Sequence, residues 1–499
     1  MFHPLAPSGV PVLPYWPAAK LGPGYPLDRP PESLNMVVAG LGIAGFSAAQ
    51  ALLARGGRVC VIDQAAGSTQ SDRAQALGRL GADVRLAAGP ELPQGDVLIV
   101  STGIPLDSPW ILAAAARGTP VWGEFELAWR LRPASGAAPW LYVTGTNGKT
   151  TTTLMLQAIL TAAGRRTTAV GNTGISLIDA VVAPEPYEVL AVEVGAPHLP
   201  FVYSVSPQAG VCLNLAPDHI DYFGDYPRYA ATKATAYLRT QETCVYNGAD
   251  PATAEMVRAA ALPRNCRAVG FTLGVPAAGM LGVVEDLLID RAFTANPDHQ
   301  AEELANLADV TPPAPHQIAN ALAAAALARA HGVPAGAIRQ GLKAFTPAAH
   351  RLTPLGQIGD VHYVDDSKAT NGHAALTALT LHDPVVWIAG GQAKGQHFDE
   401  LVARAAPRLR AVVLLGKDRG LIRAALGRQA PEVPILDIST SDQTAMARAV
   451  RAAAGIARPG DTVLLAPGCA SRDMFRDYAD RGLAFQRAVS ELSASHGRG

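Results

Sequence analysis

The stretch of the chain best suited to bind a nucleotide runs from Gly145 to Thr151 and reads Gly-Thr-Asn-Gly-Lys-Thr-Thr. Glycines let backbone amides turn toward phosphate groups, a lysine can neutralise the β- and γ-phosphates, and a hydroxyl can reach a bound magnesium ion. Lys149 and Thr150 fit the last two roles. The spacing is shorter than the usual G-x-x-x-x-G-K-[ST], because Val143 stands where the first glycine would be. A strand-like run precedes the loop and a helical run follows it, so the sequence predicts a variant ATP-binding loop.

A second glycine-rich turn lies near the start of the chain, where Gly40–Gly45 reads Gly-Leu-Gly-Ile-Ala-Gly. The apolar run 36–39 before it predicts a strand, the residues up to Arg55 predict a helix, and the run 59–62 predicts a second strand that ends at Asp63. This βαβ pattern, with an acidic residue about 20 positions after the glycines, is typical of sites for nucleotides and other diphosphates. A dehydrogenase is disfavoured, because nothing later in the chain resembles a hydride-transfer site.

The elements that must position these motifs are alternating strand-like and alanine-rich helical runs. Over 499 residues they predict an α/β protein of about three domains. We expect an N-terminal Rossmann-like domain, a central P-loop ATPase-like parallel sheet with helices, and a C-terminal Rossmann-like, doubly wound sheet. The predicted boundaries are a poorly ordered, proline-rich tail at 1–34 and domains at 35–133, 134–348 and 349–499, with a linker at 130–139. Further strand candidates are 96–101, 120–122, 362–364, 385–389, 411–415, 433–436 and 462–465.

The composition excludes several classes of function. A formal net charge of −1 provides no positive electrostatic potential that would attract nucleic acid or an anionic membrane surface. No apolar run reaches the roughly 18 residues that a membrane helix needs, and the N-terminus does not resemble a signal peptide. The five cysteines are scattered, without a C-x-x-C motif, which is typical of a reducing compartment. We therefore expect a cytoplasmic protein that acts on small molecules, and we expect a monomer.

Several short motifs follow the loop in a fixed order. They are Gly171-Asn172, Asn214 with Asp218-His219-Ile220-Asp221, Tyr229 with Lys233, Asn320-Ala321, His350-Arg351 and Asp365–Asn371. Together with Thr144–Thr153 they resemble the Mur ligase family, the amino-acid-adding enzymes of peptidoglycan synthesis, from about residue 35 to the C-terminus. Within that family, Ser367–Asn371, Ala470-Ser471 and Arg481-Gly482 are most similar to the branch that adds D-glutamate to UDP-N-acetylmuramoyl-L-alanine.

The resemblance implies an ATP-dependent ligase that converts a carboxylate into an acyl phosphate and joins it to an amine. It places catalysis on Lys149, Glu193, His219, Lys233 and Lys368. It also implies two Mg²⁺ ions, whose protein ligands would be Thr150, Glu193, His219 and a carbamylated Lys233. Carbamylation would supply a carboxylate where the gene encodes an amine, and it requires a neutral lysine.

The same resemblance assigns binding residues for each ligand. Those for ATP are Gly145, Thr146, Asn147, Gly148, Lys149, Thr150, Thr151, Asn320, Arg351 and Asp365, with Asp366 nearby. Those for a UDP-linked sugar–amino acid are Ile43, Ala44 and Asp63 at its uridine diphosphate, and Asn172 and His219 at its acyl group. Those for the incoming amino acid are Thr370, Lys394, Ser471 and Tyr478.

Two segments depart from the family pattern. The D-glutamate branch normally reads Glu-Leu-Ser-Ser-Phe-Gln-Leu after its metal-binding strand, whereas this chain reads Glu193-Val-Gly-Ala-Pro-His-Leu199. Arg472 is an added cation beside the expected amino-acid site, and Gln317 replaces a usual asparagine near the adenine. Three hypotheses remain open: the cell-wall enzyme with an altered acyl pocket, a paralogue with the same activation chemistry and another acid–amine pair, and a nucleotide sensor without turnover.

Overall fold

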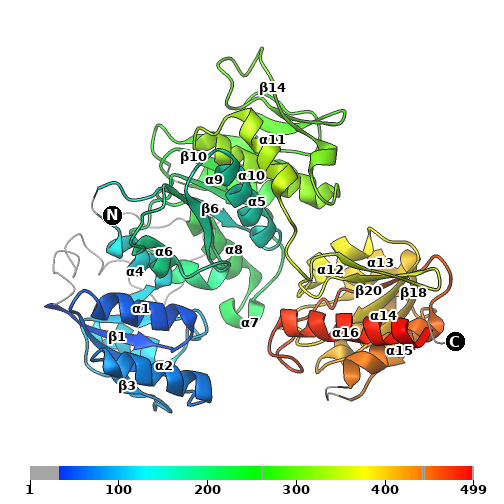
Figure 1. The fold of residues 1–499 in the computed structure, drawn as a ribbon, viewed down its shortest axis with the longest axis horizontal. Coiled ribbons are helices and arrows are strands. Elements are labelled where there is room, and N and C mark those ends of the chain that lie inside the picture. Colours follow the sequence, from blue (N-terminus) through cyan, green and yellow to red (C-terminus); the bar gives the residue numbers. More distant parts are fainter. Residues whose placement is uncertain (1–32, 134, 261, 441, 443, 497–499) are drawn as a thin grey trace. The chain divides into compact units, whose positions relative to one another are not determined.

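The computed structural model describes residues 33–496 apart from 134, 261, 441 and 443, so the tail predicted at 1–34 lies outside the described residues except for its last two. Three separate sheets, each flanked by helices, make up the fold (Figure 1). They confirm the prediction of a three-domain α/β protein. The chain divides into two compact units. One holds the described residues up to Leu215 together with Asp225–Phe345, and the other holds Ala216–Gly224 and the chain from Thr346 onward.

The N-terminal sheet is parallel throughout and has the strand order β3-β2-β1-β4-β5. The order reverses between β1 and β4, so the glycine-rich turn after β1 lies at the switch point where such sheets bind ligands. The elements of this domain are β1 (Asn35–Ala39), α1 (Ile43–Leu53), β2 (Arg58–Ile62), α2 (Ser68–Arg79), β3 (Asp83–Arg85), β4 (Val97–Val100), α3 (Pro109–Arg117), β5 (Val121–Gly123) and α4 (Glu124–Leu131). Helix α4 continues through Arg130 and Leu131, so the linker predicted from 130 is wrong at its start, because the Arg130 side chain pairs with Glu126 one turn earlier.

The central sheet has the order β14-β13-β12-β11-β10-β9-β6-β8-β7. Strands β6 to β12 pair with one another in parallel, as predicted. Strand β13 pairs antiparallel with β12 and β14 antiparallel with β13, an extension that the sequence analysis did not predict. The strands are β6 (Trp140–Thr144), β7 (Thr167–Gly171), β8 (Val189–Glu193), β9 (Ala209–Cys212), β10 (Thr243–Asn247), β11 (Arg267–Phe271), β12 (Met280–Val284), β13 (Leu287–Asp290) and β14 (Glu302–Asn306). The helices are α5 (Lys149–Ala162), α6 (Leu177–Val181), the 3-10 helix η4 (Ala196–Phe201), α8 (Tyr226–Ala234), α9 (Pro251–Ala259), α10 (Pro315–Ala330) and α11 (Ala335–Ala344).

The two faces of the central sheet bury different cores. Leu141 and Val143 of β6 pack in the cluster that contains α5, α10 and α11. Trp140 and Tyr142, which alternate with them, pack in a cluster shared with Phe125 of α4. Successive side chains of a strand point to opposite faces, so a fully apolar strand such as β6 must be covered on both sides. Side chains of the N-terminal domain cover part of the face that carries Trp140 and Tyr142.

The C-terminal sheet has the order β15-β16-β20-β17-β18-β19 and is parallel except for its edge strand β15. Its elements are β15 (Thr353–Ile358), β16 (Val361–Asp365), α12 (Gly372–Leu379), β17 (Val385–Ala389), α13 (Asp399–Ala405), β18 (Leu409–Leu414), α14 (Arg419–Gln429), β19 (Ile435–Asp437), α15 (Ala445–Ile456), β20 (Thr462–Leu465) and α16 (Tyr478–His496). The same compact unit includes the short helix α7 (Ile220–Phe223). Among the described residues, no helix is both long and apolar enough to cross a membrane.

Candidate active site

The phosphate loop leaves the carboxyl end of β6 and leads directly into helix α5, as predicted. Gly145 has a φ of +145° and Gly148 a φ of +82°, values that favour glycine. A Cβ on Gly145 would lie 3.0 Å from the Cβ of Leu213, and a Cβ on Gly148 would collide with Oδ1 of Asn320. Both glycines are therefore required by conformation and by space. The turn delivers the N-terminus of α5, where backbone N–H groups can bind phosphate.

Asn214 fixes the shape of this loop, and the sequence analysis gave it no role. The backbone N–H of Thr146 donates to the Asn214 carbonyl at 3.0 Å, and the N–H of Asn147 donates to Asn214 Oδ1 at 2.8 Å. Asn214 Nδ2 returns a bond to the Asn147 carbonyl at 3.2 Å. The Thr146 hydroxyl also lies 2.9 Å from the Tyr229 hydroxyl. The signal that could have revealed Asn214 is its place just after strand β9, the neighbour of β6.

Lys149 is the first residue of α5, and its side chain folds back over the loop. Its Nζ donates to the carbonyls of Gly145 at 3.0 Å and Thr146 at 2.8 Å. Thr150 is half-buried and Thr151 is buried on the same helical turn. The ammonium group is therefore held at the loop by carbonyls that it can exchange for phosphate oxygens.

Glu193 ends β8, the strand beside β6, and its carboxylate is only half satisfied. Oε1 accepts a bond from Asn172 Nδ2 at 2.8 Å, and Asn172 is fixed in turn because its N–H donates to the Glu193 carbonyl. Oε2 is buried and has no hydrogen-bond partner, and the residue is 1% exposed. A buried, unpartnered carboxylate oxygen is costly unless a cation satisfies it. The structure brings the predicted residues Asn172 and Glu193 together.

Lys233 lies under the start of the phosphate loop. Its side chain is buried, and its Nζ donates to the Thr144 hydroxyl at 3.0 Å and to the Gly145 carbonyl at 2.7 Å. The Thr144 hydroxyl donates onward to the carbonyl of Val194, next to Glu193. Lys233 is thus not a surface helix residue. It shares the Gly145 carbonyl with Lys149.

The oxygen atoms at this edge fit a magnesium ion. Mg²⁺ prefers oxygen ligands and keeps several waters, so it needs few protein groups. Glu193 Oε2 is available, and Thr150 carries a hydroxyl at the start of α5. Within the described part of the chain, no group of three or more His, Cys, Asp or Glu side chains forms a cage for a metal.

Asn320 of α10 faces the phosphate loop at Gly148. Its Nδ2 lies 3.3 Å from Gln317 Oε1, and both side chains are buried. The glutamine that departs from the family pattern is therefore the partner of the predicted ATP-binding asparagine.

The rewritten segment after Glu193 forms the short helix η4 and buries His198 against the N-terminal domain. The His198 ring packs 4.4 Å from the ring of Phe125, and its Nδ1 is buried without a partner. Burial, and then the positive charge of Lys233, lowers the pKa of His198 to about 3, so the imidazole is neutral at neutral pH. A Cβ built on Gly195 would lie 3.3 Å from His198 Cδ2 and 3.4 Å from Asn172 Oδ1. The segment thus borders the predicted acyl-binding residue Asn172.

The glycine-rich turn of the N-terminal domain is held by Asp63. Its Oδ2 accepts from the Leu41 N–H at 2.5 Å, and its Oδ1 accepts from the Ala65 N–H at 2.7 Å. Ile43 is 69% exposed and Ala44 is half-buried at the start of α1. The structure places these three predicted residues around one accessible turn.

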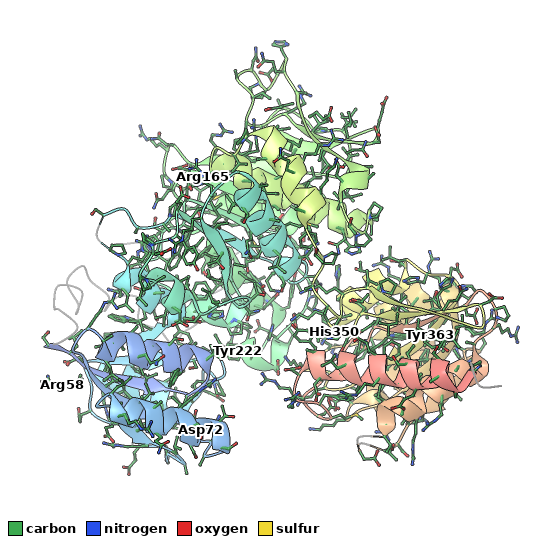
Figure 2. The ribbon with its side chains drawn as sticks, viewed as in Figure 1. Arg58, Asp72, Arg165, Tyr222, His350 and Tyr363 are labelled. Carbon is green, nitrogen blue, oxygen red and sulfur yellow. The ribbon has the colours of Figure 1, made fainter. Side chains whose placement is uncertain are left out.

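In the second compact unit, Asp365 at the end of β16 organises the loop that follows. Its Oδ2 lies 2.6 Å from His350 Nδ1, and its Oδ1 accepts from the Ser367 N–H at 2.9 Å (Figure 2 labels His350). Burial raises the pKa of its neighbour Asp366 to about 7, and the positive charge of Arg351 opposes that rise. The fully buried Arg481 donates to the Ser367 hydroxyl and carbonyl. His350 and Arg481 thus position the loop, a role that the sequence analysis did not assign.

The other predicted residues of this unit lie on loops around the same sheet, apart from Tyr478, which begins helix α16. The Lys368 Nζ lies 3.6 Å from the centre of the Tyr478 ring. The Thr370 N–H donates to the Lys368 carbonyl at 2.8 Å. Lys394 has a left-handed φ of +51°, and Ser471 is buried. Arg472, the added cation, is exposed.

His219 belongs to this second unit and not to the one that holds Glu193 and Lys233. It precedes α7 with a φ of +52°, its N–H donates to Asp218 Oδ1 at 2.9 Å, and its Nε2 lies 3.9 Å from Asp218 Oδ2. The predicted site residues therefore divide between two units.

The sequence of the chain matches one family along three stretches. Residues 34–123 match the Mur ligase MurD-like N-terminal domain, 143–328 match the Mur ligase middle domain, and 350–469 match the Mur ligase glutamate ligase domain. A protein of Streptomyces avermitilis named UDP-N-acetylmuramoylalanine–D-glutamate ligase is 56% identical over 466 residues, which cover 93% of this chain and 99% of that relative. A protein of the same name from Thermobifida fusca is 51% identical over 462 residues, which cover 92% and 98% of the two chains.

Solved structures share the fold at low sequence identity. The UDP-N-acetylmuramate-alanine ligase MurC from Thermotoga maritima superposes with a TM-score of 0.55 at 17% identity and covers 93% of this chain and 100% of its own. A pseudomurein peptide ligase type C from Methanothermus fervidus gives a TM-score of 0.57 at 16% identity, with 92% and 100% covered. With three family matches in sequence order and relatives that share more than half of their residues with it, the chain belongs to the Mur ligase family.

Proposed function

We propose that the protein is an ATP-dependent ligase that joins D-glutamate to UDP-N-acetylmuramoyl-L-alanine in peptidoglycan synthesis. The observation that carries the proposal is the carboxyl edge of the central sheet. There Lys149 of the phosphate loop, the partnerless Oε2 of Glu193 and the buried Lys233 lie on or beside adjacent strand ends. The relatives named UDP-N-acetylmuramoylalanine–D-glutamate ligase support the choice of substrates.

In the proposed reaction, Lys149 leaves the loop carbonyls, binds the phosphates and neutralises the charge that develops during transfer. A carboxylate oxygen of the acyl donor forms a bond to the γ-phosphorus, and the bond to the β,γ-bridging oxygen breaks, so ADP leaves. The amine of D-glutamate then attacks the carbonyl carbon of the acyl phosphate and loses a proton. Inorganic phosphate leaves, and an amide remains. Backbone N–H groups at the start of α5 hold the phosphates throughout.

We further propose that Mg²⁺ binds at Glu193 Oε2 and the Thr150 hydroxyl, and that His219 and a carbamylated Lys233 hold a second ion. Magnesium supplies electrostatic stabilisation of the transferring phosphoryl group when it is bound. Because the Lys233 Nζ is enclosed beside Thr144 and Gly145, a carbamate there would be shielded from solvent. The dependence of activity on bicarbonate tests this assignment, since full activity after rigorous removal of carbon dioxide would contradict it.

The decisive experiment is phosphate release by the purified protein with Mg-ATP, UDP-N-acetylmuramoyl-L-alanine and D-glutamate. We expect release only when both substrates are present, and a product heavier than the acyl donor by one glutamyl residue. L-Glutamate is the matched control, because it has the same charges and the opposite configuration. Absence of phosphate release with the D-glutamate pair would refute the proposal.

Two departures from the family pattern favour a second candidate, a paralogue with the same activation chemistry and another acid–amine pair. The segment Gly195–His198 lacks the serine and glutamine of the resembled branch, and Arg472 adds an exposed cation. A screen of acyl donors and amines separates the two candidates, because the paralogue would release phosphate with a different pair. We also propose that the protein is cytoplasmic and monomeric. Light scattering after gel filtration tests the oligomeric state.

A further inference from the structure

Two cysteine thiols of the central domain lie against each other, apart from the residues assigned to the nucleotide. The sulfur atoms of Cys244 and Cys266 are 3.8 Å apart. Cys244 is the second residue of β10 and is fully buried, whereas Cys266 directly precedes β11 and is half-buried. Strands β10 and β11 are parallel neighbours, so the fold itself holds the two thiols together.

The two thiols differ in pKa and in exposure to solvent. The hydrogen-bond contact between the two thiols lowers the pKa of Cys266 and, together with burial, raises that of Cys244. The thiolate is the nucleophilic form of cysteine, and access to solvent decides which thiol an oxidant meets first. Cys266 therefore combines the lower pKa with the greater exposure, and Cys244 stands behind it as a resolving thiol.

We propose that Cys244 and Cys266 form an oxidation site that closes to an intramolecular disulfide when the protein meets a peroxide. The Cys266 thiolate attacks one oxygen of hydrogen peroxide, the O–O bond breaks, and a sulfenic acid and water result after protonation. The Cys244 sulfur then attacks the Cys266 sulfur, the S–O bond breaks, and a second water leaves. Two thiols are oxidised by two electrons in total, and one peroxide is reduced to two waters.

The movement that closes the bond belongs to Cys266. A disulfide needs its sulfurs about 2.05 Å apart, so the pair must approach further. Cys244 is held in the interior of the sheet by hydrogen bonds to both neighbouring strands. Cys266 ends a turn in which its N–H donates to the Pro263 carbonyl, before the regular pairing of β11 begins. A shift of this turn brings the sulfurs together and leaves β10 in place.

The disulfide would enclose a segment that supports the phosphate loop. Between the two cysteines, Asn247 Nδ2 donates to the Leu213 carbonyl at 2.9 Å, and Asp250 Oδ2 accepts from the Leu215 N–H at 2.7 Å. Leu213 packs against Gly145 of the loop. The contacts of Asn247, Asp250 and Leu213 are present while the thiols are reduced, so we expect the disulfide to leave them unchanged. The disulfide would also lower the conformational entropy of the unfolded chain, which stabilises the folded state. We expect the oxidised protein to be more resistant to heat and to keep its turnover.

Mass spectrometry and thiol counting on the full-length protein test the site without reference to its substrates. After mild treatment with hydrogen peroxide, we expect the wild type to lose two of its five thiols, with the peptides that contain Cys244 and Cys266 joined. Dithiothreitol should restore both thiols. Cys266→Ser should lose none, whereas Cys244→Ser should lose only the Cys266 thiol, as a sulfenic acid that dithiothreitol reduces, and should give no joined peptides. Cys60→Ser is the matched control and should behave as the wild type, because Cys60 is also half-buried but burial and Asp83 raise its pKa to about 11.

Three results would overturn the proposal. They are retention of all five thiols, oxidation of Cys266 to sulfinic acid without a cross-link, and a cross-link that persists in Cys266→Ser. A melting temperature that falls on oxidation of the wild type would contradict the stabilising role. Cys266→Ser, at the half-exposed member of the pair, carries the test if Cys244→Ser reduces the yield of folded protein. Failure here would leave the proposed ligase reaction intact, since no substrate enters the measurement.

Discussion

Lys149 is the residue whose replacement separates catalysis from folding. Its ammonium group donates to two carbonyls of the phosphate loop. Lys149→Ala should lower kcat/KM for ATP by about two to three orders of magnitude, because a cation aimed at the developing phosphoryl charge is lost. Steady-state phosphate release measures this. Lys343→Ala, which removes an exposed lysine of the same domain, should keep wild-type activity. Near-normal turnover of Lys149→Ala would remove the loop lysine from the mechanism.

Glu193→Gln tests the charge of the carboxylate while it keeps the shape of the side chain. The amide oxygen can still accept from Asn172, so the strand end should be preserved. The formal charge that suits Oε2 for a cation disappears, and we expect the Mg²⁺ concentration for half-maximal activity to rise at least about tenfold. A magnesium titration of activity measures the change. Glu188→Gln, at an exposed residue just before the same strand, is the control. An unchanged magnesium requirement would reject Glu193 as a ligand.

Asp366 should make stability depend on pH. Burial raises its pKa from 3.8 to about 7 in the folded protein. Between about pH 4 and 7 the folded state keeps a proton that the unfolded chain has lost, so the free energy of unfolding falls as the pH rises, by up to about 4 kcal/mol. Asp366→Asn should flatten this dependence. Melting temperatures at pH 5 and 7.5 measure it, with the exposed Asp360→Asn as control. Equal pH dependence in Asp366→Asn and wild type would contradict the assignment.

At the scale of elements, the loop between β6 and α5 offers a matched pair of glycines. Gly148 and Gly332 share a φ of +82°, but a Cβ at Gly148 would collide with Asn320, whereas a Cβ at Gly332 would meet nothing within 4 Å. Alanine at either position should cost about 1–2 kcal/mol of stability for the left-handed conformation. Gly148→Ala alone should also raise KM for ATP severalfold, because the loop must shift away from Asn320. An equal KM in the two variants would show that the contact is irrelevant to nucleotide binding.

For the whole molecule, helix α4 joins the N-terminal domain to the central one. Glu126 is fully buried, accepts from the backbone N–H groups of Tyr203 and Ser204, and pairs with Arg130. Glu126→Ala would remove the carboxylate that pairs with Arg130 and accepts from these N–H groups, and we expect a loss of about 3–5 kcal/mol in the free energy of unfolding. Denaturant titration measures this. Glu255→Ala, which breaks the exposed pair with Arg258, should cost less than about 1 kcal/mol. Similar losses of unfolding free energy in Glu126→Ala and Glu255→Ala would show that the contacts of Glu126 do not hold the two domains together.

The local features of the fold could be predicted because their causes are local. Strand β6, the loop after it and helix α5 follow from an apolar run, two glycines and a helical pattern within about 20 residues. Helix α4 runs past the predicted start of the linker at 130, because Arg130 pairs with Glu126 one turn earlier. The antiparallel strands β13 and β14 were not predicted, because many of their side chains are half-buried or exposed, as in loops.

The sequence by itself determined the α/β class, the order of the motifs and the identity of the loop lysine, since each depends on neighbouring residues. Only the tertiary structure decided which groups are buried together. It placed Lys233 against Gly145, 88 residues away, left Glu193 Oε2 without a partner, and brought Cys244 to Cys266. It also assigned His219 to the unit of the C-terminal sheet. These outcomes depend on contacts between distant segments, and the periodicity of a single segment carries no information about them.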